Sequence, residues 1–174
     1  HKWLCAPKGA AFLVARKGAE KNLHPSIISH AYEKGFKAEF GKIGTRDASA
    51  WLCVPAAIEF HQRLGGSKLK VRNSLLAAKA GRHLIEAFKT QLAGPLECFA
   101  AMVSIQIPGN LPATPEVADI RRHRLWEEQK IDVLILPIGQ SLWLRFCIHA
   151  YNAEADISRL SQGLLQVVAS ITGE

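Results

Sequence analysis

Residues 141–151, SLWLRFCIHAY, decide the fold of the second half of this 174-residue chain. Apolar side chains occur at every second position, and alternate side chains of a β-strand point to opposite faces of a sheet. The stretch therefore predicts a strand with one wholly apolar face, which must meet a hydrophobic core. That face consists of Leu142, Leu144, Phe146, Ile148 and Ala150. The opposite face carries Arg145, between Trp143 and Cys147.

The pattern leaves two interpretations of Arg145 open. In the first, it is a surface arginine whose aliphatic stem packs on Trp143. In the second, its guanidinium lies in a cleft and binds a carboxylate through two parallel hydrogen bonds. The periodicity by itself favours neither interpretation.

The segments on either side of this strand predict a small α/β domain over residues 93–174. Its expected elements are a strand at 98–107, a helix at 115–129, strands at 131–137 and 141–151, and a helix at 153–172. Thr114 and Pro115 are typical of a helix start. The inner face of the last helix is expected to consist of Ile157, Leu160, Leu164, Val167 and Ile171. Together these elements give the order βαββα.

Residues 1–92 precede this domain. The apolar run at 10–16, AAFLVAR, follows a Pro-Lys-Gly turn and predicts a buried strand. Residues 18–47 predict a long irregular connection, and connections of this length inside compact domains are usually functional. Helices are expected at 48–64 and at 68–92, and the second of these is expected to bridge to the small domain.

The composition is that of an ordinary globular protein, with 48% apolar and 21% charged residues. No apolar run approaches the roughly 18 residues needed to cross a membrane, so we expect no membrane partner. The net charge is +7, but we expect the basic run at 121–124 to form a solvated helix face and to bind no nucleic acid, because no binding motif accompanies it. The four cysteines lack the spacing of a zinc site, and we expect them to be reduced and buried, with no metal bound.

Three blocks in the sequence resemble the class V aminotransferase family of pyridoxal-phosphate enzymes, and most closely its isopenicillin-N-epimerase-like branch. They are HKWLCAPKGAAFL at 1–13, GTRDASAWLCVPAAIEF at 44–60 and LRFCIHAYNAEADISRL at 144–160. The resemblance covers nearly all of this chain but only about the last half of the family's length. It implies the C-terminal part of the pyridoxal-phosphate-dependent transferase (aspartate aminotransferase-like) fold. Residues 1–92 would then be the end of the large domain, and residues 93–174 the small α/β domain.

The resemblance also implies a role for several residues. Pyridoxal phosphate is an aldehyde, so an amine must hold it as a Schiff base, and Lys2 matches the family's lysine. His1 matches a residue that supports the cofactor. Gly44 and Thr45 match a turn that reaches the phosphate in the neighbouring subunit's active site, which implies a homodimer with shared sites. Arg145 matches the arginine that binds the α-carboxylate of an amino acid substrate.

The family performs transamination, epimerisation, elimination or removal of sulfur from cysteine. Enzymes of the cysteine desulfurase and selenocysteine lyase type use a cysteine on a mobile loop shortly before the carboxylate-binding arginine. Residues 115–144 contain no cysteine, which disfavours that alternative and leaves epimerase or lyase-like chemistry open. The resemblance does not decide whether Arg46 and Asp47 pair with each other and thereby fix the loop, or touch the ligand.

The family's other cofactor contacts lie before the lysine. They include the carboxylate on the pyridine nitrogen, the group stacked over the ring and the main phosphate cradle. We therefore expect this chain to be a fragment of an enzyme and to be inactive by itself. The reduced cysteines predict a cytoplasmic location for that enzyme. An alternative expectation is a catalytically incomplete fragment that acts only as an interaction module.

Overall fold

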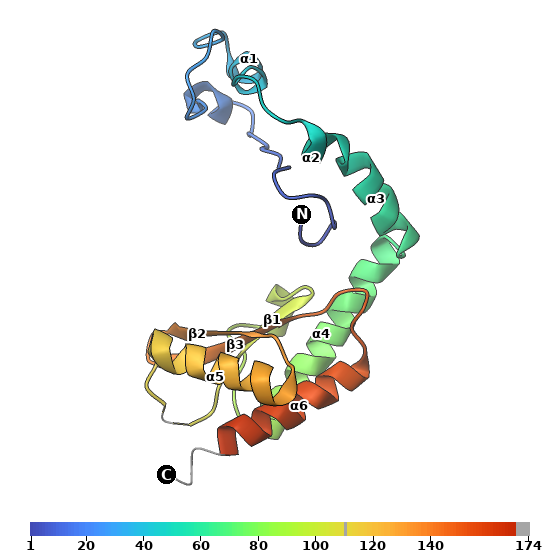
Figure 1. Ribbon diagram of the computed structural model, residues 1–174, viewed down its shortest axis with the longest axis vertical. Helices are drawn as coiled ribbons and strands as arrows, with labels where there is room; N and C mark the ends of the chain where they lie inside the picture. The colour runs from blue at the N-terminus through green and yellow to red at the C-terminus, as the bar shows by residue number, and fades with distance from the viewer. Residues whose placement is uncertain (110, 170–174) are drawn as a thin grey trace. The chain divides into compact units, whose positions relative to one another are not determined.

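The strand predicted at 141–151 is the centre of a three-stranded antiparallel sheet (Figure 1). The computed structural model describes residues 1–109 and 111–169. The strands are β1 (Met102–Gln106), β2 (Leu134–Ile138) and β3 (Ser141–Cys147). β3 lies between the other two strands. A two-residue turn at Gly139 and Gln140 joins β2 to β3, and Gly139 has the positive φ of 61° that such a turn requires.

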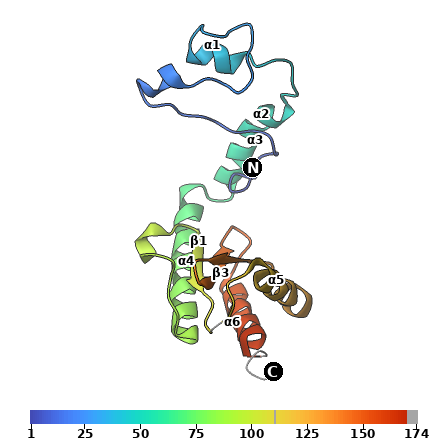
Figure 2. The same ribbon diagram turned by 90° about the vertical axis from the view of Figure 1, so that its left-hand side faces the viewer.

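Three helices pack against one face of this sheet (Figures 1 and 2). They are α4 (Ser67–Phe88), α5 (Pro115–Gln129) and α6 (Glu154–Ala169). α4 packs on β1, α5 packs on β2, and α6 contacts both of these helices. α5 begins as predicted, because the Thr114 hydroxyl accepts a hydrogen bond from the Val117 amide at 3.3 Å. The order β1-α5-β2-β3-α6 confirms the predicted βαββα arrangement.

The buried face of the sheet is the apolar face predicted from the alternation in β3. Leu144 is fully buried and pairs in register with Ile105 of β1 and Ile135 of β2, which are 1% and 3% exposed. The other buried members of this face in and after β3 are Leu142, Phe146 and Ile148. α4 approaches the sheet closely, because a Cβ atom at Gly81 would lie 3.1 Å from Cγ1 of Val103.

The opposite face of the sheet, called the open face below, is only partly buried. Arg145 lies there, in register with Ser104 of β1 and Leu134 of β2, and all three residues are half-buried. The other residues of the open face are Met102, Gln106, Leu136, Trp143 and Cys147. The alternation therefore places Arg145 away from the core, as the sequence predicts.

Leu144 offers a direct test of this core. Leu144→Ala is expected to lower the free energy of unfolding by about 2–5 kcal/mol, because it leaves a cavity in a fully buried site. The matched control is Leu136→Ala on the open face, where the leucine is 37% exposed, and its expected cost is about 1 kcal/mol or less. Urea unfolding of the full-length protein measures both. Equal losses for the two variants would contradict this assignment of the core face.

Two compact units make up the chain, and the sheet with its helices belongs to the second. The first unit is His1–Arg63, and the second begins at Leu64. The sequence predicts a different boundary, at residues 92 and 93, between the large and small domains of the complete protein. That domain boundary stays a prediction.

The first unit is largely irregular. Its helical elements are η1 (Ala19–Asn22, a 3₁₀ turn), α1 (Phe36–Gly41), α2 (Ser49–Leu52) and α3 (Val54–Arg63). The buried strand predicted at 10–16 is wrong for this structure, since the segment forms no strand and Phe12 and Val14 are 93% and 78% exposed. A strand needs a neighbour to satisfy its backbone groups. The described residues supply no strand beside this segment.

Two element boundaries differ from the prediction for local reasons. The helix predicted at 48–64 is divided at Cys53 into α2 and α3, because Pro55 lacks an N–H group and its ring crowds the carbonyl four residues earlier. β1 begins at Met102 rather than at 98, because Leu96–Cys98 form the 3₁₀ turn η2. The predicted last turn of the final helix, with Ile171, lies outside the described residues.

Arg121 shows that the basic run in α5 is not one solvated face. This side chain is 6% exposed, and its Nη1 donates a hydrogen bond to the Val167 carbonyl at 3.4 Å. Val167 belongs to the last turn of α6, where the helix dipole favours a cation. Burial, and next the charge of Arg124, lower the pKa of Arg121.

The expectation that the cysteines are buried is also wrong. All four are exposed, and none forms a disulfide. Cys5 and Cys53 lie in the first unit, which buries few apolar side chains, and Cys147 is on the open face. Among the helices that the structure describes, none is long and apolar enough to cross a membrane.

Candidate active site

Lys2 lies in an exposed turn of the first unit. The Cys5 amide donates a hydrogen bond to the Lys2 carbonyl at 3.3 Å, and Cys5 has a positive φ of 58°. The Lys2 ammonium makes no hydrogen bond or ion pair with any described residue. Gly9 ends the following turn, and a Cβ atom there would lie 3.8 Å from Cβ of Ala50 in α2. The fold of the first unit therefore leaves this amine available and places the following turn against α2.

The GTRD block at 44–47 presents Gly44 and Thr45 at the surface. Gly44 has a φ of 100°, a conformation that side-chain-bearing residues rarely adopt. Thr45 is exposed and makes no hydrogen bond with a described residue. An exposed hydroxyl beside a left-handed glycine turn has the donors that phosphate oxygens require.

Arg46 and Asp47 fix this block to α2 and do not pair with each other. The Arg46 guanidinium lies 3.8 Å from the centroid of the Trp51 ring, a cation–π contact. Asp47 Oδ1 accepts hydrogen bonds from the Ser49 amide at 2.8 Å and from the Ser49 hydroxyl at 2.5 Å. Of the two possibilities left open by the sequence, pairing of Arg46 with Asp47 is wrong for this structure, because each residue contacts α2 separately. Contact of either residue with a ligand stays a hypothesis.

The hydrogen bonds to Asp47 make this anchor pH-dependent. The Ser49 hydroxyl, and next the Ser49 amide, lower the pKa of Asp47 below its ordinary value. A carboxyl whose pKa is lowered on folding stabilises the folded state above its unfolded pKa. This stabilisation is lost as the pH falls through the lowered value, so the GTRD turn is anchored at neutral pH.

A buried pair within the long connection was not predicted from the sequence. Glu39 of α1 is 3% exposed, and its Oε2 lies 2.7 Å from Nδ1 of His24. The Tyr32 ring lies beside that imidazole, with centroids 5.9 Å apart. The two partners are 15 residues apart and belong to no motif, so no sequence signal could have identified the pair. The contact holds the connection that leads into the GTRD block.

Arg145 is distinctive among the arginines of this chain. It is half-buried on the open face, yet its guanidinium makes no hydrogen bond or ion pair with a described residue. Other arginines are engaged by carboxylates, carbonyls or an aromatic ring: Arg46, Arg63, Arg72, Arg121, Arg122, Arg124 and Arg159. Arg16 and Arg82, which have no such partner among the described residues, are exposed. A half-buried guanidinium with unused donors is suited to an anionic ligand.

Arg145 lines a hollow that only partly belongs to the open face. A hollow of about 360 Å³ is lined by Arg145, Arg122, Asp132, Tyr151 and Asn152, among others. Arg122 Nη2 lies 3.6 Å from Asp132 Oδ1, so its charge is partly compensated. This leaves Arg145 as the uncompensated cation of the hollow. Asn152 was not predicted to be a site residue, although asparagine is typical of turns.

The structure distributes the predicted site residues over both units. His1, Lys2, Gly44 and Thr45 are exposed residues of the first unit, and Arg145 is a half-buried residue of the second. No cluster of three or more histidine, cysteine or acidic side chains suited to a metal ion occurs among the described residues.

Comparison with curated proteins finds relatives along almost the whole chain, and no family model matches it. A probable chloroplastic L-cysteine desulfhydrase of Arabidopsis thaliana is 32% identical, over 94% of this chain and 38% of its own length. An isopenicillin N epimerase of Streptomyces clavuligerus is 31% identical, over 100% of this chain and 46% of its own length. A putative L-cysteine desulfhydrase of Oryza sativa subsp. japonica is 40% identical, over 97% of this chain and 39% of its own length. The chain thus spans less than half the length of these relatives.

Solved structures of related shape identify the fold. A cysteine desulfurase from Thermococcus onnurineus matches 86% of this chain with a TM-score of 0.59 and 20% identity, over 39% of its own chain. A serine palmitoyltransferase from S. paucimobilis matches 82% of this chain with a TM-score of 0.56 and 16% identity, over 34% of its own chain. The predicted resemblance is confirmed by the relatives, and the predicted C-terminal part of the pyridoxal-phosphate-dependent transferase fold is confirmed by these structures.

Proposed function

We propose that this chain, a homologue of L-cysteine desulfhydrases and isopenicillin N epimerases, is part of a pyridoxal-phosphate-dependent enzyme that acts on an amino acid. The observation that carries the proposal is the half-buried Arg145 guanidinium, which makes no hydrogen bond or ion pair with a described residue. A carboxylate satisfies such a group through two parallel hydrogen bonds. Two of the relatives described above are named for L-cysteine, which carries an α-carboxylate.

The expected cofactor is pyridoxal phosphate, and the residues present fit it. The Lys2 amine is exposed and has no competing ion pair among the described residues, as an amine that attacks an aldehyde requires. Thr45 offers a hydroxyl, and Gly44 a turn open to phosphate oxygens. When bound, the pyridoxal ring supplies an electron sink for the substrate's α-carbon.

Each residue then has a separate task. Lys2 would hold the cofactor through its amine, and the same amine would move a proton at the substrate's α-carbon. His1, exposed beside Lys2, supports the cofactor. Arg145 holds the substrate's α-carboxylate and thereby orients the α-carbon. Gly44 and Thr45 bind the phosphate in the neighbouring subunit's site, so the active protein is a homodimer.

We favour elimination and epimerisation over transamination, and both reactions begin with removal of the α-proton. The names of the relatives include both kinds of activity. Sulfur transfer through a protein thiol is the alternative. It is disfavoured because residues 115–144 contain no cysteine and Cys147 lies on β3 rather than on a loop.

The test uses the full-length protein purified with pyridoxal phosphate. A visible absorbance band of the bound cofactor, sulfide release from L-cysteine, and exchange of the α-proton in deuterium oxide would support the proposal. Exchange without sulfide would favour epimerisation. Absence of cofactor binding would leave the interaction module as the better account. We also propose a cytoplasmic location, although one relative is named as chloroplastic.

Mixed dimers test the proposal that each active site contains residues of both subunits. Lys2→Ala and Thr45→Ala should each inactivate the full-length enzyme, but mixed dimers of the two should regain about half of the wild-type activity per dimer. The reason is that one of their two sites keeps both residues intact. The control is a mixed dimer of wild type with the double variant, in which every site lacks one residue. Verified mixed dimers with no activity would contradict sharing.

A further inference from the structure

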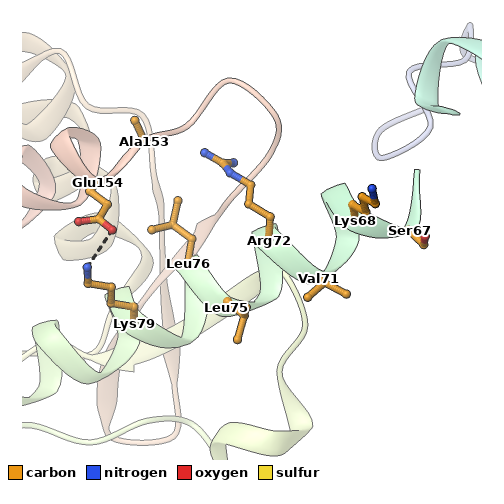
Figure 3. Close-up of a pocket in the computed structure, with 9 residues that line it drawn as sticks. All are labelled: Ser67, Lys68, Val71, Arg72, Leu75, Leu76, Lys79, Ala153 and Glu154. Atoms are coloured by element: carbon orange, nitrogen blue, oxygen red, sulfur yellow. Dashed lines mark hydrogen bonds and ion pairs between the residues drawn. The ribbon is translucent and has the colours of Figure 1, made fainter. Parts of the chain in front are cut away.

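Arg72 of α4 holds the turn that follows β3. Its Nη1 donates hydrogen bonds to the His149 carbonyl at 3.0 Å and to Asn73 Oδ1 at 3.0 Å, and its Nη2 donates to the Asn152 carbonyl. Figure 3 shows the guanidinium pointing away from α4 toward the chain that leads to Ala153. The planar guanidinium of Arg72 therefore binds the carbonyls at both ends of a single turn.

The turn itself is closed by its own hydrogen bonds. The His149 amide donates to Asn152 Oδ1 at 2.9 Å, and the Asn152 amide donates to the His149 carbonyl at 3.1 Å. The Tyr151 ring stacks near the His149 ring, with centroids 5.4 Å apart and an interplanar angle of 26°. These internal hydrogen bonds hold the residues of the turn together. The hydrogen bonds from Arg72 to the His149 and Asn152 carbonyls therefore fix the position of the whole turn relative to α4.

The same turn forms part of the wall around Arg145. Tyr151, which is 82% exposed, and Asn152 both line the hollow that contains Arg145. Arg72 does not line that hollow. It lies instead along a separate hollow of about 760 Å³ beside α4, shown in Figure 3.

We propose that Arg72 is a positioning residue for the substrate-binding hollow. Its hydrogen bonds keep Tyr151 and Asn152 in fixed positions. These two residues then line the hollow in a defined arrangement when a carboxylate binds to Arg145. This inference rests on the proposed function of Arg145. A lysine at position 72 could keep the charge, but it could not bind the two carbonyls in the same planar geometry.

The chain provides a matched control in Lys79. Its Nζ lies 2.8 Å from Oε1 of Glu154, so it also links α4 to the segment after β3 by a charged contact (Figure 3). The two side chains are 60% and 70% exposed. Neither lines the hollow around Arg145. A general loss of contact between α4 and this segment would affect the variants of both residues. Loss of the hydrogen bonds from Arg72 to the turn would affect only the Arg72 variants.

The experiment compares Arg72→Ala, Arg72→Lys and Lys79→Ala in the full-length enzyme. Hydrogen–deuterium exchange should increase at least about fivefold at residues 149–152 in Arg72→Ala and remain unchanged in Lys79→Ala. The KM for L-cysteine should rise about 5- to 30-fold in Arg72→Ala, with kcat within about threefold of wild type and the cofactor absorbance unchanged. Arg72→Lys should lie between Arg72→Ala and wild type in both measurements.

Two results would overturn the inference. Unchanged exchange at 149–152 in Arg72→Ala would show that Arg72 does not hold the turn. Arg72→Ala could also raise the exchange but leave the KM unchanged. If Arg145→Ala changed the KM of the same enzyme, that result would show that Arg72 has a structural role only. If the wild type neither turned over L-cysteine nor bound the cofactor, the proposed function would fail, and the exchange comparison would still decide whether Arg72 fixes the turn.

Discussion

Lys2→Ala in the full-length enzyme is expected to lower kcat by at least about 1000-fold, to the limit of detection. Under the role proposed for Lys2, the variant loses both the amine that would hold the cofactor and the base that would move the α-proton. Lys2→Arg should be equally inactive, because a guanidinium keeps the charge but is not a nucleophile near neutral pH. Lys8→Ala is the matched control. Lys8 is also an exposed lysine of the same N-terminal segment, and its replacement should leave kcat within about twofold of wild type.

Chemical trapping tests whether Lys2 carries the cofactor without a measurement of turnover. Borohydride reduction of the cofactor-loaded protein, followed by peptide mapping, should find the pyridoxyl group on Lys2. The visible cofactor band should be lost or shifted in both Lys2 variants and retained in Lys8→Ala. A pyridoxyl group on any other lysine, or full activity of Lys2→Ala, would refute the role given to this residue.

Arg145→Ala is expected to lower kcat/KM by about 30- to 1000-fold, the equivalent of about 2–4 kcal/mol for a charge-assisted pair in a partly dry hollow. Arg145→Lys should be nearly as impaired, because an ammonium group cannot present two parallel donors to a carboxylate. The cofactor absorbance should persist in both variants, since Arg145 is proposed to touch the substrate and not the phosphate.

The control for Arg145 is Arg82→Ala. Arg82 is an exposed arginine that, like Arg145, has no hydrogen bond or ion pair with a described residue, but it lies on α4 rather than on the open face. Its replacement should leave kcat/KM within about twofold of wild type. Steady-state kinetics decide the question. If Arg145→Ala stayed within about threefold of wild type, the interpretation of Arg145 as a surface residue packed on Trp143 would be the better one.

The second unit could be predicted well because its signals are local. The period-two pattern of β3 gives its buried face, and the Thr114–Pro115 pair gives the first turn of α5. Each signal depends only on residues within one element, and the packed structure agrees with them. The same pattern placed Arg145 on the open face, but only the structure shows that its guanidinium lacks a described partner.

The errors occurred where burial depends on distant partners. The apolar run at 10–16 has the composition of a buried strand, yet a strand forms only beside another strand, and the described residues contain none at that place. Arg121 lies in a basic run but is covered by the end of α6. The hydrogen bond from Arg72 to the His149 carbonyl joins residues 77 positions apart, and no local sequence pattern predicts such a contact.

Pro137 in β2 bears on how copies of this protein can assemble. β2 is an edge strand, and a proline there offers no N–H group to a strand added from outside. The sheets of two subunits are therefore poorly suited to join at this edge into one continuous sheet. Addition of a strand from another copy is therefore discouraged at β2 by the backbone itself, whatever side chains surround the proline.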